Sequence, residues 1–389
     1  MLLKDLCDHN IGTYGIGASA CAYNEEYPVY LRITDISDDG KLLKPFRASI
    51  NPKDYPNWKD YILKMNDLVF ARTGNSTGRN YFHNTNEQLV YAGFLIRFSI
   101  NPSKVLPRYV GYYCQSESYW NQIKTFLEGS TRPTMNAELY KSLDIPIAAR
   151  ELQQHIVDTI GTIDDLIEIK LQTIAKLDEL AQKTFDAYFG SINEKTYALQ
   201  EICEFIPGYS YKSEELKDSS MGMVSIKCIG TGNDFRKEGI KSLYPLKEIP
   251  KKKRCNTNDV LVCHTDLTKN QDIIGRPILI PAKGKFASLT FSMDLVKVSP
   301  KDDRFSKVLI FRVLNSNSFK KHALSFCSGT TVVHLSKKAL QTYRFNGPMQ
   351  GFEKLSEHLQ TYQNQINLLT SEIDILETQK VFLLNKHFS

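Results

Sequence analysis

A proline-free run over residues 150–190 carries apolar side chains at alternating steps of three and four residues. These positions are Ile156, Ile160, Ile163, Ile167, Ile174, Leu177 and Ala181. Such spacing is typical of a coiled-coil seam, and a helix of this length forms a rod of roughly 60 Å. A rod with one apolar stripe must bury that stripe against a partner, so this run constrains the fold of the whole chain.

The same pattern returns over residues 352–388. Its apolar positions are Leu355, Leu359, Tyr362, Ile366, Leu369, Ile373, Leu376 and Leu383. Two rods of matching length within one chain can pack antiparallel and bury both seams, which is the interpretation we favour. The alternative is two ordinary amphipathic helices, each lying on its own domain.

Length and composition limit the class of protein. A chain of 389 residues with 42% hydrophobic content is long enough for two or three cores, and it has no apolar run that could cross a membrane. The first residues lack the features of a signal peptide, so we expect a cytoplasmic protein. The eight cysteines form no CxxC pair, which argues against a zinc site and favours reduced thiols.

Charge is divided unevenly along the chain. Residues 150–190 hold four basic and eight acidic side chains, and residues 352–388 hold three and five. The rest of the chain therefore carries 42 basic and 30 acidic residues, a net charge of +12. The densest basic run is 236–254, although such runs are often only solvated surface. This division predicts that nucleic acid contacts the segments outside the rods, whereas the rods contact protein.

The segments outside the rods repeat one another. The runs 29–36 and 66–74 reappear as 223–229 and 258–266, with offsets of 193 and 192 residues, and the run 129–136 reappears at 329–336 with an offset of 200. In each copy, the last of these runs (129–136 or 329–336) is followed by a proline, Pro146 or Pro348, and then by a rod. The order globule, rod, globule, rod indicates two diverged copies of one unit and predicts a pseudo-twofold molecule.

Each globular segment has the pattern of an α+β domain. Strands are predicted at 68–71, 89–100, 260–263, 278–280 and 288–298, and helices at 107–127 and 307–325. We therefore expect four parts: a first globular domain at 1–149, a helix at 150–190, a second globular domain at 191–350 and a helix at 351–389.

On these motifs the chain resembles the specificity (S) subunit of Type I restriction-modification systems. In the first half they read NDLVFARTGN at 66–75 and GSTRPTMN at 129–136, and in the second half LVCHTDLTKNQDIIGRP at 261–277 and GTTVVH at 329–334. The second half departs from the first at His264-Thr-Asp266, where the first half has Arg72-Thr-Gly74. The resemblance implies two target-recognition domains separated by two long helices that pack as an antiparallel coiled coil.

The resemblance also implies a function and partners. Each domain would read one half of an asymmetric bipartite sequence in double-stranded DNA, and helix length would set the unread spacer. Two methylation (M) subunits would dock on the helices, and restriction (R) subunits would join through them. The chain itself would be non-catalytic and need no cofactor, since S-adenosylmethionine, ATP and magnesium would belong to the partner subunits.

The chemistry of the motif side chains supports DNA contact. Arginine can hold guanine or phosphate, asparagine can pair with adenine, and hydroxyls can take either role. The candidate DNA-binding residues are Arg72, Thr73, Asn75, Ser76, Thr77, Arg79, Ser130, Thr131, Arg132, Asn136, Tyr209, Tyr211, His264, Thr265, Thr268, Lys269, Asn270, Arg276, Thr330 and Thr331. Two structural readings stay open. Arg72 could satisfy a buried carboxylate beside a turn at Thr73 and Gly74, and the residues 130–136 could form a helix N-cap.

Several activities lack their signatures in this sequence. It has no NPPY- or DPPY-type methyltransferase motif, no phosphate-binding loop of the GxxxxGK[ST] type and no acidic cluster with a lysine typical of a nuclease. The nearest alternative function is the recognition subunit of a Type IIB or methylation-only system. A coiled-coil protein scaffold is more distant, and a self-contained nuclease is more distant still.

Overall fold

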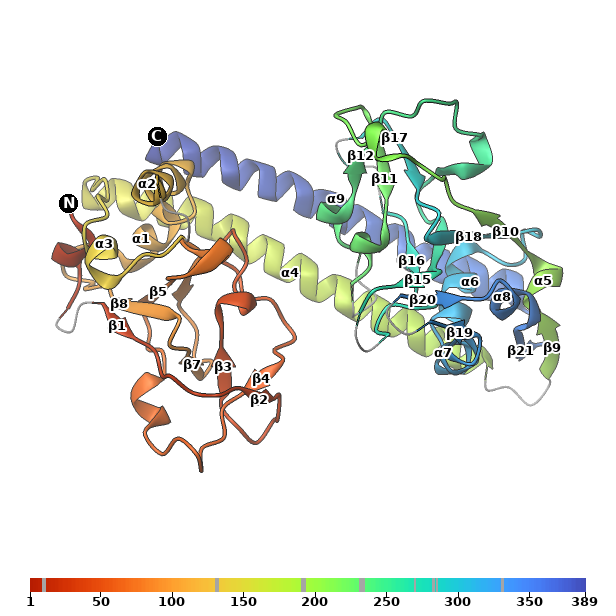
Figure 1. The fold of residues 1–389 in the computed structure, drawn as a ribbon, viewed down its shortest axis with the longest axis horizontal. Helices are drawn as coiled ribbons and strands as arrows, with labels where there is room; N and C mark the ends of the chain where they lie inside the picture. Colours follow the sequence, from red (N-terminus) through yellow and green to blue (C-terminus); the bar gives the residue numbers. More distant parts are fainter. Residues whose placement is uncertain are drawn as a thin grey trace. The chain divides into compact units, whose positions relative to one another are not determined.

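The computed structural model describes residues 1–8, 12–129, 133–189, 194–230, 235–268, 271–281, 284, 286–329 and 332–389. Internal contacts divide the chain into unit 1, which comprises Met1–Glu168 and Asp374–Ser389, and unit 2, which comprises Ile169–Ile373. Each unit combines one globular segment with part of both long helices, α4 (Arg150–Phe189) and α9 (Phe352–Phe388) (Figure 1). Both helices thus form where the apolar spacing predicted them.

Within each unit α4 and α9 run antiparallel. In unit 1, Lys380 of α9 lies 2.7 Å from Asp164 of α4, while Ile156 and Ile160 share a core with Leu384 and Phe388. In unit 2 an ion pair of 2.7 Å joins Lys170 to Glu372, and the rings of Phe189 and Phe352 lie 6.2 Å apart. Higher numbers on α4 therefore meet lower numbers on α9. The seam positions of both helices are buried or half-buried, as predicted.

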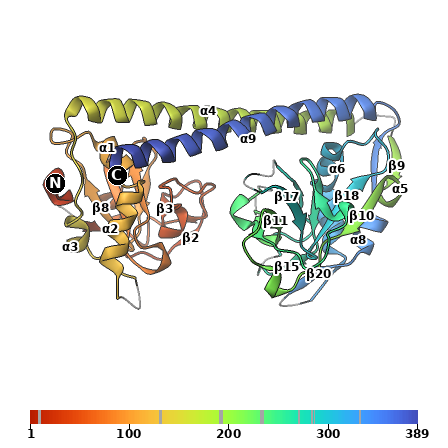
Figure 2. The same cartoon turned by 90° about the horizontal axis from the view of Figure 1, so that it is seen from above.

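Unit 1 contains two four-stranded sheets with the strand orders β1-β8-β5-β6 and β2-β4-β3-β7. The strands are β1 (Thr13–Tyr14), β2 (Cys21–Ala22), β3 (Val29–Leu31), β4 (Ala48–Ser49), β5 (Asp67–Ala71), β6 (Asn80–His83), β7 (Leu89–Tyr91) and β8 (Leu95–Ser99). The helices of its globular part are α1 (Pro107–Tyr113), α2 (Glu117–Leu127) and α3 (Ala137–Lys141). The C-terminal end of α9 lies beside α1, where the ring of Phe388 is 5.1 Å from that of Tyr109 (Figure 2).

Unit 2 contains sheets with the orders β10-β18-β14-β16, β12-β11-β17-β13, β15-β20-β19 and β21-β9. The strands are β9 (Glu194–Ala198), β10 (Cys203–Pro207), β11 (Met221–Val224), β12 (Lys241–Ser242), β13 (Arg254–Cys255), β14 (Val260–Cys263), β15 (Thr265–Asp266), β16 (Pro277–Leu279), β17 (Ser288–Phe291), β18 (Leu295–Pro300), β19 (Cys327–Ser328), β20 (Val333–Leu335) and β21 (Arg344–Pro348). Its shorter helices are α5 (Leu199–Ile202), α6 (Lys307–Leu314), α7 (Asn317–Leu324) and α8 (Lys338–Thr342).

The two units share one strand scheme, which confirms the repeat seen in the sequence. The central strand β5 pairs with β8 through Ala71 and Leu95, and β14 pairs with β18 through Cys263 and Leu295. The parallel pair β3 and β7 has its counterpart in β11 and β17. These registers reproduce the sequence offsets of 192, 193 and 200 residues.

A glycine occupies the same place in both copies for a steric reason. A Cβ atom at Gly15 would lie 2.2 Å from the carbonyl oxygen of Ala92, and one at Gly208 would lie 2.0 Å from that of Ser292. No side chain fits so close to backbone, so glycine is required where the chain leaves β1 and β10.

Four element predictions were wrong in their boundaries. The strands predicted at 89–100 and 288–298 are each two strands in different sheets, because the chain turns before Leu95 and Leu295 and passes from one sheet to the other. The helices predicted at 107–127 and 307–325 are each two helices, since Ser116 and Ser316 interrupt the run and cap the second helix. A serine side chain that accepts from the N–H three residues later ends one helix and starts another.

An acidic residue of α4 ties the globular part of each unit to the helix pair. In unit 1 the hydroxyl of Tyr112, on α1, donates to Asp164 at 3.0 Å. In unit 2 the equivalent position is Arg312, on α6, which is buried and pairs with Asp178. Arg312 is the buried charge here, and its pairing with Asp178 offsets part of the free-energy cost of removing it from water.

Candidate nucleic-acid interface

The interface predicted in unit 1 begins where β5 ends. The hydroxyl of Tyr140, buried beneath this point, donates to the carbonyl of Ala71 at 2.7 Å and accepts from the N–H of Gly78 at 3.1 Å. Burial raises the pKa of Tyr140, so the hydroxyl stays protonated and donates. The loop 72–79 is therefore held at both ends on the core, and its middle projects outward.

Arg72 is the first residue of this loop. Its guanidinium carbon lies 5.0 Å from the ring centroid of Tyr14, which is cation–π distance. Its Nε atom is buried and has no hydrogen-bond partner in the structure. The buried carboxylates of unit 1 that the structure describes have other partners: Asp35 pairs with Arg32, and Asp67 is met by Ser99 and Arg97. The structural reading in which Arg72 satisfies a buried carboxylate is therefore wrong.

The other loop residues divide between exposed and structural positions. Gly74 has a φ of 72°, starts a short 3-10 helix through Ser76, and leaves Asn75 exposed, so the turn expected at Thr73 and Gly74 is present. Thr77 is buried and donates to the carbonyls of Gly74 and Pro133. Arg79 forms an ion pair of 2.6 Å with Asp38. Among the described candidates of this loop, Thr73, Asn75 and Ser76 have side chains without a partner in the protein and remain available for a ligand.

The second candidate run of unit 1 is described only in part. Ser130, Thr131 and Arg132 lie outside the described residues. Asn136 accepts from the N–H of Leu139 at 3.0 Å and begins α3, so its N-cap reading is confirmed. An exposed N-cap side chain leaves room for a second contact, but the cap explains its identity without one.

In unit 2 a buried carboxylate organises the equivalent loop. Asp266 is fully buried and accepts hydrogen bonds from the N–H groups of Thr268, Ile273 and Ile274 at 2.6, 2.8 and 2.8 Å. Thr268 also accepts from Asp272. The Asp that replaces Gly74 of the first copy is therefore structural, and it folds the loop back on its own strand.

Other unit 2 candidates have intramolecular partners. Thr265 is buried in β15 and lies 3.4 Å from Nδ1 of His334. Arg276 donates to the carbonyl of Asp272. Tyr209 donates to Glu215 at 2.6 Å, and the ring of Tyr211 lies 5.9 Å from Nζ of Lys241. Lys269, Asn270, Thr330 and Thr331 lie outside the described residues.

His264 stands at the position that corresponds to Arg72. Its N–H donates to the carbonyl of Asp294 at 2.7 Å, as that of Arg72 donates to Phe94 at 3.0 Å. Its Nε2 atom is buried without a hydrogen-bond partner, which is also the condition of the Arg72 Nε atom. Burial, and then the charges of Lys337 and His334, lower the pKa of His264 to about 4. The imidazole is consequently neutral near pH 7.

A cavity of about 160 Å³ adjoins this imidazole, and we call it the His264 cavity. Its lining residues are Phe205, Pro207, His264, Val296, Lys337, Leu340 and Gln341. Sequence reasoning selected only His264 from this set. The segment around α8, more than 70 residues away along the chain, contributes Lys337, Leu340 and Gln341. No local motif could have predicted that these residues lie near His264.

The basic side chains of the run predicted at 236–254 are exposed or half-buried. Lys253 donates to the carbonyl of Gly208 at 2.9 Å, and Arg254 donates to that of Ile249. Lys247, Lys251 and Lys252 are exposed, and the nearby side chains of Tyr244 and Leu246 are 59% and 58% exposed. Aromatic and apolar groups among lysines are a surface that can contact sugars and phosphates. Tyr244 and Leu246 were not among the sequence candidates.

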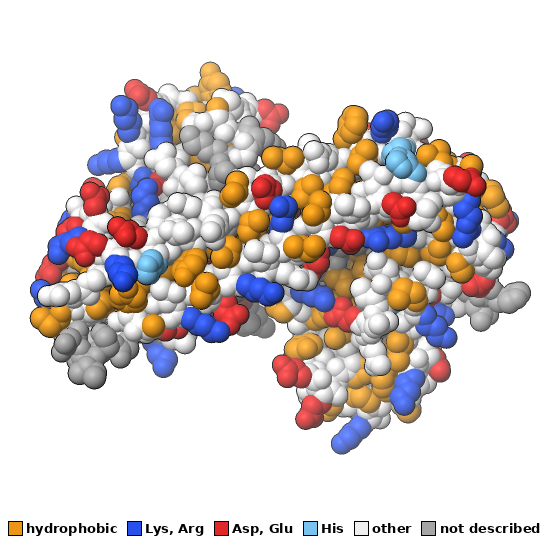
Figure 3. All heavy atoms as spheres, turned by 180° about the vertical axis from the view of Figure 1, so that it is seen from behind, with side chains coloured by type: hydrophobic (Ala, Val, Ile, Leu, Met, Phe, Trp, Pro, Cys, Tyr) orange, Lys and Arg blue, Asp and Glu red, His pale blue; other side chains and the backbone are white. Residues whose placement is uncertain are grey.

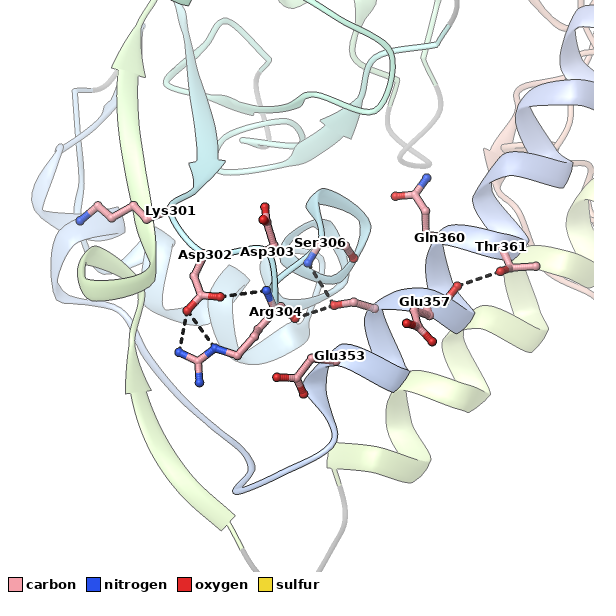
Figure 4. Close-up of a pocket in the computed structure, with 10 residues that line it drawn as sticks. Lys301, Asp302, Asp303, Arg304, Ser306, Glu353, Glu357, Gln360 and Thr361 are labelled. Atoms are coloured by element: carbon pink, nitrogen blue, oxygen red, sulfur yellow. Dashed lines mark hydrogen bonds and ion pairs between the residues drawn. The ribbon is translucent and has the colours of Figure 1, made fainter.

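A second hollow, of about 980 Å³, lies between the loop after β18 and the first turns of α9 (Figure 4). The loop contributes Asp302, Asp303 and Arg304, and α9 contributes Glu353 and Glu357. Arg304 pairs with Asp302 at 2.6 Å. The remaining carboxylates give this hollow an acidic lining, which disfavours phosphate.

The outer surface of α9 carries large apolar side chains. Leu368, Ile375, Val381 and Phe382 are 61%, 58%, 56% and 66% exposed. Figure 3 shows apolar side chains alternating with acidic and basic ones over the long helices. Within the described ranges, no helix is long and apolar enough to span a bilayer, and no group of three His, Cys, Asp or Glu side chains is arranged to hold a metal.

Comparison with known proteins agrees with this geometry. Residues 1–179 match the family model of the Type I restriction modification DNA specificity domain. The chain is 27% identical over 170 residues to the HindI specificity subunit of Haemophilus influenzae, and 24% identical over 186 residues to the MjaVIII specificity subunit of Methanocaldococcus jannaschii. These matches cover 43% and 46% of this chain but only 36% and 43% of the relatives.

A solved structure extends the likeness in fold to the whole chain. The S subunit of a Type I system from M. genitalium superposes with a TM-score of 0.56 at 13% identity, covering 100% of this chain and 95% of that one. The chain resembles Type I specificity subunits, and it has the α+β fold that this resemblance implied.

Proposed function

We propose that this chain, whose first 179 residues match the Type I DNA specificity domain, is the non-catalytic DNA-recognition subunit of a Type I restriction-modification complex. Each unit would read one half of an asymmetric, bipartite sequence in double-stranded DNA. Two methylation subunits would dock on the long helices and supply S-adenosylmethionine, and restriction subunits with ATP and magnesium would join through them.

The observation that carries this proposal is a repeated scaffold with unequal loops. The strands β5 and β14 have the same register and neighbours in the two units, yet Arg72-Thr-Gly74 follows one and His264-Thr-Asp266 follows the other. Two copies of one scaffold can present their loops to DNA in the same way, while different side chains on those loops select different bases. Two such units therefore favour a target with two different halves.

The helices support docking of protein partners. Their seams are buried within each unit, whereas α9 still exposes Leu368, Ile375, Val381 and Phe382. Apolar side chains on a surface among charged ones are typical of protein interfaces. The acidic charge of both helices disfavours DNA there.

Methylome sequencing tests the proposal directly. A host that produces this chain with a methylation subunit is compared with a host that produces the methylation subunit alone. We expect a new asymmetric split motif only when the chain is present. A matched variant, Asn75→Ala with Ser76→Ala, should change one half of the motif and leave the other half as it was.

The opposite result would also be clear. If the methylation subunit binds the chain and is active, but the set of methylated sites is the same with and without the chain, the chain does not read DNA. Retained methylation of both half-sites at a fixed spacer by the methylation subunit alone would lead to the same conclusion.

A further inference from the structure

The guanidinium group of Arg72 has no hydrogen-bond or ion-pair partner among the described residues. Arg72 is half-buried, and of its guanidinium nitrogens only Nε is buried without a partner, so Nη1 and Nη2 are open to a ligand. A cation that is partly removed from water and has no acceptor raises the free energy of the folded protein. A ligand with acceptor oxygens would remove that cost.

This cation is held in place at both ends of its side chain. The backbone N–H of Arg72 donates to the carbonyl of Phe94 at 3.0 Å, and its own carbonyl accepts from the N–H of Met135 at 2.9 Å. At the other end, the guanidinium carbon lies 5.0 Å from the ring centroid of Tyr14, whose hydroxyl accepts from the N–H of Ala137 at 3.2 Å. The arginine side chain has therefore lost conformational freedom on folding, which lowers the entropic cost of binding a ligand.

The place of Arg72 in its loop suits a phosphate better than a base. The guanidinium packs on Tyr14 at the point where the loop leaves β5, whereas Asn75 is exposed in the middle of the loop. Base edges lie at the floor of a major groove about 8.5 Å deep, while phosphates line the outer surface of the duplex. A side chain that packs on its own protein can meet phosphate oxygens there, and the two terminal nitrogens of a guanidinium match two of these oxygens.

The charge of Arg72 is the one that this loop leaves unpaired. The other cation of the loop, Arg79, forms an ion pair of 2.6 Å with Asp38. That pair neutralises Arg79 within the protein, so an anionic ligand gains less from it. The two arginines of one loop thus form a natural comparison, because one is paired and the other is available.

The second copy lacks both residues of this arrangement. The sheet registers place His264 where unit 1 has Arg72, and Pro207 where unit 1 has Tyr14. The Nε2 atom of His264 is buried, and proline has no aromatic face on which a cation could pack. The arrangement is therefore a property of unit 1.

We propose that the terminal guanidinium nitrogens of Arg72 hold one backbone phosphate of the bound DNA, and that Tyr14 is the positioning residue that keeps this cation in place. The proposal rests on the proposed function, because it names a contact within the DNA complex. The contact fixes unit 1 on the duplex and selects no base, so it acts equally on target and non-target DNA.

The experiment measures DNA binding against salt. The full chain, in complex with a methylation subunit, is titrated with a fluorescent duplex that contains the methylome-defined target and with one of scrambled sequence. Each neutralised phosphate adds about 0.9 to the slope of log affinity against log salt. Arg72→Gln should therefore reduce that slope by about 0.9 and weaken binding about tenfold on both duplexes. Arg79→Gln is the matched control and should leave the slope unchanged, because Asp38 already pairs with that arginine.

Variants of Tyr14 test its positioning role. Tyr14→Leu removes the ring but keeps the charge of Arg72, and it should weaken binding to both duplexes about two- to fivefold. Tyr14→Phe keeps the ring and should retain the affinity and the salt slope. Because Tyr14 acts through Arg72, the double variant Arg72→Gln with Tyr14→Leu should bind no more weakly than Arg72→Gln alone. Thermal melting of each variant verifies that it is folded.

Other outcomes would contradict the proposal in distinct ways. An unchanged slope for Arg72→Gln, in a complex that still binds the target, would show that Arg72 holds no phosphate. A loss confined to the target duplex would show that Arg72 contacts a base. Additive losses in the double variant would exclude the positioning role of Tyr14. Failure of the unmodified complex to bind either duplex would overturn the proposed function itself, and the phosphate contact with it.

Discussion

Replacement of Asp266 by alanine should destabilise unit 2 through the loop that carries the candidate interface. The carboxylate is fully buried and accepts three backbone N–H groups, from Thr268, Ile273 and Ile274. Ile273 and Ile274 are themselves buried, so water cannot replace the acceptor for their amides. Thr268 is half-buried and can find water.

The magnitude follows from the two buried amides. Each donor left without a partner costs about 1 to 3 kcal/mol, so Asp266→Ala should lower the free energy of unfolding of unit 2 by about 2 to 6 kcal/mol. Asp266→Asn can place its amide oxygen where Oδ2 accepts from both buried amides and should therefore lose much less. Since domains are ordinarily stable by about 5 to 15 kcal/mol, the loss expected for Asp266→Ala leaves most of that range folded and unfolds only a domain at its lower end.

Hydrogen–deuterium exchange under increasing urea measures this loss for unit 2 separately. Both tryptophans, Trp58 and Trp120, lie in unit 1, so their fluorescence follows that unit in the same samples. Asp272→Ala is the matched control, since it removes the same charge from the same loop but leaves the Asp266 hydrogen bonds in place. A loss below about 1 kcal/mol for Asp266→Ala, or an equal loss for Asp272→Ala, would refute the reasoning.

Three further outcomes are expected. Because the pKa of His264 is lowered from 6.5 to about 4 in the folded protein, the unfolded chain takes up the proton first as pH falls. The stability of the wild type should thus decline relative to that of His264→Gln as the pH falls from 6.5 to 4, and the difference should be constant above pH 6.5, which pH-dependent urea titration will show. Phe382→Glu on α9 should abolish co-purification of a methylation subunit while Gln379→Glu on the same helix does not; retained binding in both would exclude this surface. Removal of residues 165–171 together with 371–377 shortens the paired helices by about 10 Å, or about three base pairs. Methylome sequencing should then find a shorter spacer between unchanged half-sites, and an unchanged spacer would contradict the proposed role of the helices.

The local sequence pattern was sufficient to predict the two long helices and the repeat. The spacing of Ile156, Ile160 and Ile163 predicts a helix, because only the 3.6-residue period brings these side chains to one face. Breaks within shorter elements were missed, since Ser116 and Ser316 act as caps only when their side chains turn toward the next helix.

The candidate site shows why motif chemistry alone could not rank its residues. Thr77, Thr265 and Asp266 belong to the motifs that carried the resemblance, yet all three are buried and bonded within the protein. The sequence does not distinguish a polar side chain that is hydrogen-bonded within the protein from one that is available to a ligand.

The sequence by itself determined the two rods, the duplicated unit and the division of charge between them, because periodicity, spacing and net charge are properties of the chain order. Only the tertiary structure decided that Tyr14 lies over Arg72 in one copy while His264 and Pro207 line a cavity in the other. These residues come from strands and helices far apart in the sequence. Their meeting depends on sheet register and on side-chain volume, which no local pattern encodes.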